Sequence, residues 1–334
     1  MASFIRTYQL AQRAVGSYFL RMPLGVSFEI TRNCNAFCKH CHLGGRMEEE
    51  VQATPEELAR RNRELRPVVT MVSGGEPLLR KDLIDILQAI KKQGRARHMV
   101  LTTHGALLNR KKYESIREAG VDLVSLSFDY PDERHDEFRG IPGLFNKIMG
   151  FLEDIQNFED KGIAFSTVVQ RDNYRDLPKI AEIARTYGIQ MNMSTYTWLR
   201  TQKREYMIPP EELPELKAII QQLRDFKKKH NTVIASEFGF KRMIEFFEKG
   251  SLDNCRAGKR FLIINPDATL SPCGLIMGEY KTRRALINDF SKNNDCGYCA
   301  TSIRVNCEKT FPYYLMDVLK FLCGSFFPQK RETH

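Results

Sequence analysis

Short runs of apolar and β-branched residues alternate along residues 26–195 with longer segments in which apolar positions have a helical spacing. This alternation is typical of repeated βα units, in which strands join a parallel sheet and helices cover its outer face. We expect six units, and therefore an α/β fold with a partial (β/α)6 barrel of the TIM type. The expected strands are 26–30, 68–72, 98–102, 123–127, 163–169 and 190–195.

The segments between these strands carry signals for helix ends. The segment 54–66 opens with Thr54 as an N-cap, followed by Pro55 and two glutamates that suit the first turn of a helix. Glycines follow several of the segments, where a left-handed residue can end a helix. The other expected helices are about 80–93, 109–119, 143–160 and 175–187.

The pattern changes after Pro209 and Pro210. Two helices are predicted at 211–229 and 237–249, and residues 261–273 have the pattern of two strands around a Pro-Asp turn. This hairpin would place Cys273 at the end of its second strand. We therefore expect an amphipathic helix at 1–22, the barrel at 23–205, a helical connection at 206–250, a small cysteine-bearing α+β module at 251–310 and an apolar helix at 311–334.

The two ends of the chain have apolar helical patterns. Residues 1–22 contain no acidic residue, and residues 311–327 are more apolar still. Three interpretations remain open: both helices pack on the barrel, they lie on a membrane surface, or the first is an organellar transit peptide. No segment approaches the roughly 20 consecutive apolar residues that a membrane span needs.

Composition narrows the class of protein. The chain has 334 residues, of which 42% are hydrophobic and 28% charged, so disordered and fibrous classes are excluded. Nine cysteines are an odd number, and polar residues interrupt every early apolar run that could form a secretory signal. We therefore expect a cytoplasmic protein, with peripheral contact at the inner membrane surface as the alternative. The net charge of +10 is scattered among 41 acidic residues, which does not predict a nucleic-acid partner.

Three cysteines with CxxxCxxC spacing, Cys34, Cys38 and Cys41, lie in the loop directly after the first predicted strand. Three thiolates on one short loop can bind three irons of a [4Fe–4S] cluster and leave the fourth iron open. A zinc site completed by His40 or His42 is the alternative that the spacing alone leaves.

A glycine-rich turn, Ser73-Gly74-Gly75-Glu76-Pro77, follows the second predicted strand. Its glycines would let a ligand approach the backbone, and the carboxylate of Glu76 could hold an ammonium group. An ordinary tight turn gives the same pattern. Because the loops after successive strands converge at one end of a βα barrel, we expect this turn to lie near the three cysteines.

Taken together, these two motifs resemble the radical S-adenosylmethionine (SAM) superfamily over roughly residues 25–300. The resemblance implies that the three cysteines hold the catalytic [4Fe–4S] cluster, that SAM chelates its open iron, and that Gly74, Gly75 and Glu76 bind the SAM amino group. It implies reductive cleavage of SAM to a 5′-deoxyadenosyl radical, which abstracts a hydrogen atom from the substrate. A reductant such as flavodoxin or ferredoxin is the implied protein partner.

Polar residues after the later strands fit the same resemblance. Thr103 and His104 stand where many members carry a Thr-Asn-Gly turn, and residues 135–140 resemble the cofactor-side loop of peptide-modifying members. His40 and His104 depart from the aromatic residue and the asparagine usual at their positions. Ordinary surface loops remain the alternative. The resemblance suggests SAM-binding roles for Thr103, Ser127, Asp129, Arg171 and Asn173, and it identifies no catalytic residue.

Four further cysteines lie in the C-terminal part. Cys255, the hairpin residue Cys273, and the pair Cys296 and Cys299 form a complete set of four thiolates. The arrangement resembles the twitch or SPASM auxiliary-cluster module of the superfamily, although an alanine replaces the glycine of its usual Pro-Asp-Gly turn. We expect a second, auxiliary [4Fe–4S] cluster here, with structural zinc as the alternative. Cys307 and Cys323 are expected to be buried thiols, with Cys307 as a substitute ligand in a second interpretation.

A fully ligated auxiliary cluster favours an oxidative reaction, in which hydrogen abstraction is followed by loss of an electron. The first hypothesis is an oxidoreductase or maturase that acts on a peptide or small molecule. The second is a membrane-associated enzyme that acts on a lipid or lipid-linked substrate. The third is a non-enzymatic iron–sulfur or zinc electron carrier, which would gain nothing from an open iron site.

Overall fold

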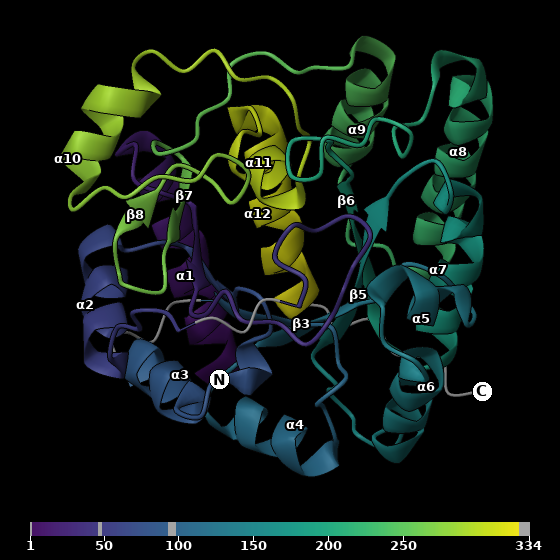
Figure 1. The fold of residues 1–334 in the computed structure, drawn as a ribbon, viewed down its shortest axis with the longest axis horizontal. Coiled ribbons are helices and arrows are strands. Elements are labelled where there is room, and N and C mark those ends of the chain that lie inside the picture. Colours follow the sequence, from purple (N-terminus) through teal and green to yellow (C-terminus); the bar gives the residue numbers. More distant parts are fainter. Residues whose placement is uncertain (1, 46–48, 93–97, 327–334) are drawn as a thin grey trace.

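The computed structural model describes residues 2–45, 49–92 and 98–326. Within them, one sheet of eight strands has the order β6-β5-β4-β3-β2-β1-β7-β8 (Figure 1). Its first six strands are parallel and sequential neighbours, which confirms the partial barrel. Each begins and ends within one residue of its prediction: β1 (Gly25–Glu29), β2 (Val69–Ser73), β3 (His98–Thr103), β4 (Leu123–Ser127), β5 (Ile163–Val169) and β6 (Gln190–Thr195).

Helices cover the outer face of this sheet, where apolar strand residues such as Val26 and Phe28 are fully buried. The first of them begins as predicted, because Thr54 and Glu57 form a reciprocal capping box. The helices between the strands are α2 (Pro55–Leu65), α3 (Leu83–Lys92), α4 (Arg110–Glu118), α5 (Arg134–Arg139), α6 (Leu144–Asp154) and α7 (Leu177–Thr186), with short 3-10 turns at η1 (Pro77–Leu79) and η2 (Tyr174–Asp176).

The helix predicted at 143–160 is shorter than expected and ends at Asp154. The chain then turns, and the amide of Phe158 donates to the carbonyl of Ile155. The turn lets the ring of Phe158 pack against Tyr113, with ring centroids 5.9 Å apart. Burial of an aromatic ring on the neighbouring helix therefore outweighs the local helical pattern.

The predicted C-terminal hairpin forms from β7 (Phe261–Ile264) and β8 (Leu270–Ser271), which are antiparallel. The sequence did not predict its place in the sheet. Strand β7 pairs in parallel with β1, so that Gly25 lies opposite Phe261. The hairpin therefore continues the barrel sheet, and Cys273, two residues after β8, lines the inside of the barrel.

The segment around α11 (Ser302–Cys307) closes the open side of the barrel beside β6. The amide of Ala300 donates to Thr195 Oγ1 (3.1 Å), and the amide of Ser302 donates to Ser194 Oγ (3.2 Å). The remaining elements of this part are η3 (Pro210–Glu212), α8 (Leu213–His230), α9 (Glu237–Lys249), α10 (Arg283–Leu286) and the π-helical turn η4 (Ile287–Ser291).

Helices α1 (Ala2–Phe19) and α12 (Phe311–Phe326) pack on each other, although they come from opposite ends of the chain. The rings of Tyr18 and Tyr314 lie 5.0 Å apart, and Ala14 joins Val68 and Phe261 in an apolar cluster below the strands. Both helices thus pack on the barrel, as the first of the three interpretations expects. No helix in the described ranges has the length and apolar character needed to cross a membrane.

Candidate functional site

One cavity of about 700 Å³ occupies the inside of the barrel. The loop after β1 brings Cys34, Cys38 and Cys41 to its wall, and the C-terminal part brings the four other predicted ligands: Cys255, Cys273, Cys296 and Cys299. Many inward-facing strand positions carry hydroxyls, and apolar side chains such as Met71 and Val100 lie among them on the same wall. The structure therefore places both predicted cysteine sets on one cavity.

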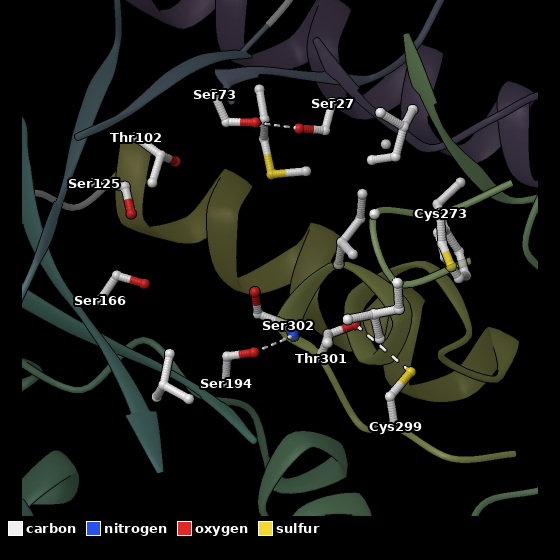
Figure 2. Close-up of a pocket in the computed structure, with 18 of the residues that line it drawn as sticks. Ser27, Ser73, Thr102, Ser125, Ser166, Ser194, Cys273, Cys299, Thr301 and Ser302 are labelled. Carbon is white, nitrogen blue, oxygen red and sulfur yellow. Dashed lines mark hydrogen bonds between the residues drawn. The ribbon is translucent and has the colours of Figure 1, made fainter. Parts of the chain in front are cut away.

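Hydroxyl groups from successive strands face this space (Figure 2). Thr102, Ser125 and Ser166 project from β3, β4 and β5, on the wall opposite Cys273 and Cys299. These groups can donate and accept hydrogen bonds without bringing charge into the cavity.

The glycine turn holds the first cysteine loop. The amide of Gly75 donates to the carbonyl of Thr31 (2.7 Å), and the amide of Glu76 donates to the carbonyl of Asn33 (2.9 Å). A Cβ atom at Gly75 would lie 2.2 Å from the Asn33 oxygen, and Gly74 has a φ of +140°. The two glycines are therefore required for close approach of the cysteine loop, and both also line the cavity.

Glu76 lies behind the wall and is fully buried. Its carboxylate accepts hydrogen bonds from Thr103 Oγ1 (2.7 Å) and from the amides of His104 and Leu78 (3.0 Å each). It therefore ties the turn after β2 to the turn after β3. Of the residues predicted to bind SAM, the structure brings Gly74, Gly75, Thr103 and Ser127 to the cavity wall.

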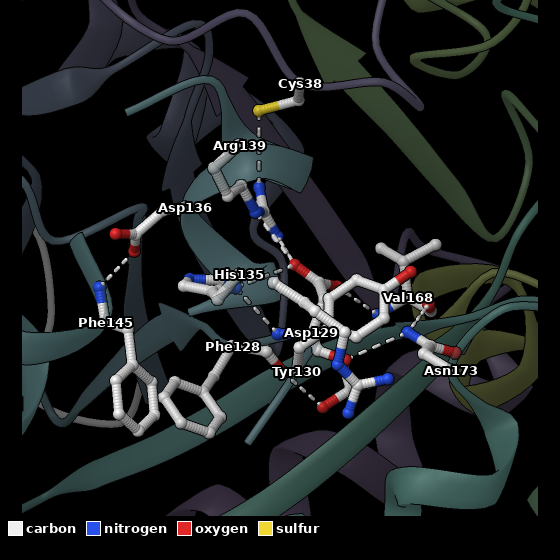
Figure 3. A network of polar contacts seen from close by, with 12 residues as sticks. Cys38, Phe128, Asp129, Tyr130, His135, Asp136, Arg139, Phe145, Val168 and Asn173 are labelled. Atoms are coloured by element: carbon white, nitrogen blue, oxygen red, sulfur yellow. Dashed lines mark hydrogen bonds and ion pairs between the residues drawn. The ribbon is translucent and has the colours of Figure 1, made fainter. Parts of the chain in front are cut away.

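Asp129 and Asn173 do not line the cavity and belong to a buried network of polar contacts (Figure 3). Asp129 is fully buried and accepts a hydrogen bond from Arg139 Nε (2.8 Å), while Arg139 Nη1 lies 3.7 Å from Cys38 Sγ. Asn173 Nδ2 donates to the carbonyls of Asp129 and Val168. This buried network fixes a guanidinium group beside the first cysteine set.

Arg171 does not reach the cavity. Its side chain is 46% exposed and donates to Glu212 Oε1 (2.7 Å) at the start of α8. The strand that precedes Arg171 was predicted correctly, but Arg171 is the second residue after the end of β5 and its side chain points outward. Its predicted role in SAM binding has no support from this arrangement.

Two further arginines contact the cysteines and were not predicted. Arg200 Nη1 lies 3.6 Å from Cys41 Sγ, and its Nη2 donates to the carbonyl of Gly274 (2.7 Å), next to Cys273. Arg304 is fully buried, donates to the carbonyl of Cys299 (2.8 Å) and lies 3.8 Å from its sulfur. Neither has a local sequence signal. Arg200 lies far along the chain from Cys41, and Arg304 follows Cys299 closely but lies outside the spacing that marks the cysteines.

Glu29 carries the only carboxylate among the described residues that line the cavity. It ends β1 and lies 3.8 Å from Arg200, the arginine that contacts Cys41. Burial raises its pKa, and the nearby guanidinium groups of Arg200 and Arg32 only partly offset this effect. It is therefore a buried carboxylate with an increased affinity for a proton.

The thiols fit iron–sulfur ligation in their burial and in their neighbours. Burial raises the pKa of Cys34 and Cys255 to about 11, and that of Cys273 to about 12. Each cysteine set has arginine donors beside its sulfurs, which suits the negative charge of a thiolate-bound cluster. Within the described ranges no three potential ligands converge on one metal ion. A cubane cluster needs no such convergence, since each thiolate binds a different iron.

Comparison with known proteins agrees with this geometry. Residues 28–184, which hold the first cysteine set and the glycine turn, match the family model of the Radical SAM superfamily. This part of the chain belongs to the superfamily. A radical SAM enzyme uses a [4Fe–4S] cluster and SAM, so the first cysteine loop, the glycine turn and the cavity between them suit its cofactors.

Curated relatives of this radical SAM enzyme include the AdoMet-dependent heme synthase of Oleidesulfovibrio alaskensis. It is 28% identical over 278 residues, which cover 75% of this chain and 69% of that protein. The protein of the same name from Methanosarcina barkeri is 32% identical over 175 residues, which cover 50% of this chain and 48% of the relative. The match to that second relative thus spans about half its length.

Among solved structures, native anSMEcpe with bound AdoMet and a Cp18Cys peptide has a TM-score of 0.59 with this chain at 17% identity. The superposition covers 92% of this chain and 97% of that one. The similarity therefore extends over the whole fold, including the C-terminal part beyond the family match.

Proposed function

We propose that this radical SAM enzyme carries out a two-electron oxidation of a substrate held inside the barrel. The observation that supports the proposal is the placement of two cysteine sets on one cavity. When bound, a [4Fe–4S] cluster with SAM supplies a 5′-deoxyadenosyl radical that removes a hydrogen atom from a substrate, and an auxiliary cluster supplies a one-electron acceptor.

In this proposal, Cys34, Cys38 and Cys41 hold the first cluster, and Gly74, Gly75, Thr103 and Ser127 contact SAM. Glu76, Asp129 and Asn173 act as positioning residues, since they fix the turns and Arg139 without lining the cavity. The sheet and α11 exclude water from the space in which the substrate would lie.

Cys255, Cys273, Cys296 and Cys299 hold the auxiliary cluster in this proposal. Arg304 stabilises its negative charge through its position beside Cys299. Arg200 contacts both the loop of Cys41 and the residue after Cys273, and so fixes the spacing of the two sites.

Glu29 is the proposed acceptor of the proton that the oxidation releases. A two-electron oxidation removes a hydrogen atom, an electron and a proton from the substrate, so a base must take the proton. Glu29 is the carboxylate on the cavity wall, and its raised pKa makes it a better base than an exposed glutamate. We therefore assign the proton to the Glu29 carboxylate.

The substrate class is a small molecule or a peptide side chain. The names of the relatives support a small molecule, and the row of hydroxyls at Thr102, Ser125 and Ser166 suits a substrate with polar groups. A lipid-linked substrate is a second candidate, favoured by the exposed apolar residues of α1 and α12. A flavodoxin or ferredoxin is the proposed reductant.

Anaerobic reconstitution tests the two sites without knowledge of the substrate. We expect about eight irons per chain and release of 5′-deoxyadenosine after reduction with dithionite. The double variant C38A/C41A should lose SAM cleavage, whereas C273A/C296A should keep it and bind about four irons. About four irons together with zinc in the unsubstituted protein would reassign the second site.

The oxidative outcome needs a substrate screen. Candidate small molecules and peptides are scored by stimulation of 5′-deoxyadenosine release, and the product is then weighed by mass spectrometry. A product lighter than its substrate by two hydrogen atoms is expected. A product of unchanged mass, formed with the auxiliary cluster intact, would contradict the proposed oxidation.

A further inference from the structure

The outer sides of α1 and α12 carry an exposed apolar patch, made of Phe19, Leu20, Leu315, Met316 and Leu319. Their exposed fractions are 63%, 75%, 36%, 47% and 50%. Single exposed apolar residues are common on protein surfaces, but four on two contacting helices and a fifth, Leu20, directly after the first helix are not. An exposed apolar patch of this kind indicates a surface at which a binding partner covers the side chains.

The five residues form one surface. The rings of Phe19 and Phe311 lie 5.0 Å apart, and Leu315 and Leu319 follow Phe311 at successive turns of α12. Tyr18, Tyr314 and Val318 point the other way, into the apolar cluster below the barrel. The patch is thus the outer face of a helix pair whose inner face is already packed.

Positive charge borders the apolar patch. Arg21 is exposed directly after Leu20, and the guanidinium of Arg283 lies at the same end of α1, where its Nη2 donates to the backbone carbonyls of Arg21 (2.9 Å) and Lys259 (3.1 Å). On α12, Asp317 is paired with Lys309. The first acidic residue of the whole sequence is Glu29, which faces the cavity.

We propose that the apolar patch and its basic border dock the enzyme on the surface of an anionic lipid bilayer. Helices α1 and α12 would lie along the interface, with the five apolar side chains among the lipid chains and the cations at the headgroups. An apolar surface with a cationic border complements a negatively charged membrane better than it complements a second, equally cationic copy of this chain. This docking does not depend on the proposed reaction.

Flotation with vesicles tests the proposal on the full chain. Vesicles of phosphatidylcholine with phosphatidylglycerol should carry the enzyme, vesicles of phosphatidylcholine alone should carry much less, and high salt should weaken binding. The variant L315E/L319E should lose at least about tenfold in vesicle affinity. Val51→Glu, at an apolar residue that is 78% exposed outside the patch, is the matched control and should bind like the unsubstituted protein.

A second variant separates loss of docking from misfolding of L315E/L319E. Arg21→Glu keeps the apolar patch and removes part of its border, so it should weaken binding only to the anionic vesicles. Iron content and SAM cleavage of each variant report folding separately from docking. Equal vesicle binding by L315E/L319E and Val51→Glu, or a dimer in solution without any vesicle binding, would overturn the proposal.

Discussion

Ala268 occupies a left-handed backbone conformation, with a φ of +64°, in the turn between β7 and β8. Its position is the one where the auxiliary-cluster modules that this chain resembles carry glycine. A side chain in this conformation costs roughly 1–2 kcal/mol, which a glycine would avoid. Part of that gain would be offset, because glycine loses more conformational entropy on folding than alanine does. The turn therefore holds Ala268 in a backbone conformation that alanine disfavours.

We expect Ala268→Gly to raise the free energy of unfolding by about 0.5–1 kcal/mol. Ala89→Gly, in the middle of α3, is the control and should lower it by about 1 kcal/mol. Urea denaturation measures both. A loss of stability in Ala268→Gly would show that its buried methyl group matters more than the strain.

Glu29 should make stability depend on pH. Because burial raises its folded-state pKa, its contribution is fully present below the unfolded-state value and is lost as the pH rises through the folded-state value. Glu29→Gln cannot ionise, so its stability relative to the unsubstituted protein should increase as the pH is raised toward 8. Urea denaturation from pH 5 to pH 8 measures this difference, with the exposed Glu64→Gln as the control. A constant difference over that range would be inconsistent with the raised pKa.

At this scale the sequence identified the cysteines and missed their neighbours. The spacing of Cys34, Cys38 and Cys41 is local, so it is visible in the sequence alone. Arg200 reaches the sulfur of Cys41 through the packing of distant segments, and Arg304 lies only five residues after Cys299 but outside the spacing that marks the cysteines. A role for such residues can be recognised only after the fold is known.

At the scale of elements, the contact between the first cysteine loop and the glycine turn is the most constrained feature of the site. A methyl group on Gly75 would overlap the carbonyl of Asn33, whereas nothing lies within 4 Å of the corresponding position at Gly150. Gly75→Ala must therefore push the loop away from the turn.

We expect Gly75→Ala to reduce SAM cleavage by at least about tenfold, because misplacement of a cofactor site by about 1 Å has effects of that size or more. Gly150→Ala, within α6, should leave SAM cleavage unchanged and slightly stabilise the helix. Release of 5′-deoxyadenosine by the reconstituted variants measures the effect. Unchanged cleavage in Gly75→Ala would mean that the loop relaxes without harm to the site.

Most helices and strands could be predicted from the sequence, whereas the pairing of strands that lie far apart in the chain could not. The alternation of short apolar, β-branched runs with helical segments predicted the six barrel strands to within a residue. The pairing of β7 with β1 joins residues more than 200 positions apart, and no local pattern encodes it. The end of α6 was likewise set by the packing of Phe158 on another helix.

At the scale of the whole molecule, α1 closes the barrel floor through its inner face. Ala14 is 7% exposed and packs with Leu24, Val68 and Phe261. Ala14→Asp would bury a charge in this cluster and should lower the free energy of unfolding by about 3 kcal/mol or more.

Gln12→Asp is the control, since Gln12 is exposed on the same helix, and it should change the free energy of unfolding by less than about 1 kcal/mol. Thermal or urea denaturation compares the two variants. Similar stability of both would mean that α1 contributes little to the fold and that its role lies in docking alone.

The pairing of β1 with both β2 and β7 has a consequence for the order of events during synthesis. Strand β1 leaves the ribosome early, yet one of its two neighbours is made only when residue 264 has been added. At the usual rate of synthesis this is a delay of roughly 10–40 s, during which the strand that carries Glu29 and leads into the first cysteine loop has an unpaired edge. The loop that holds Cys34, Cys38 and Cys41 is thus synthesised well before β7 and the second cysteine set, which complete the cavity around it.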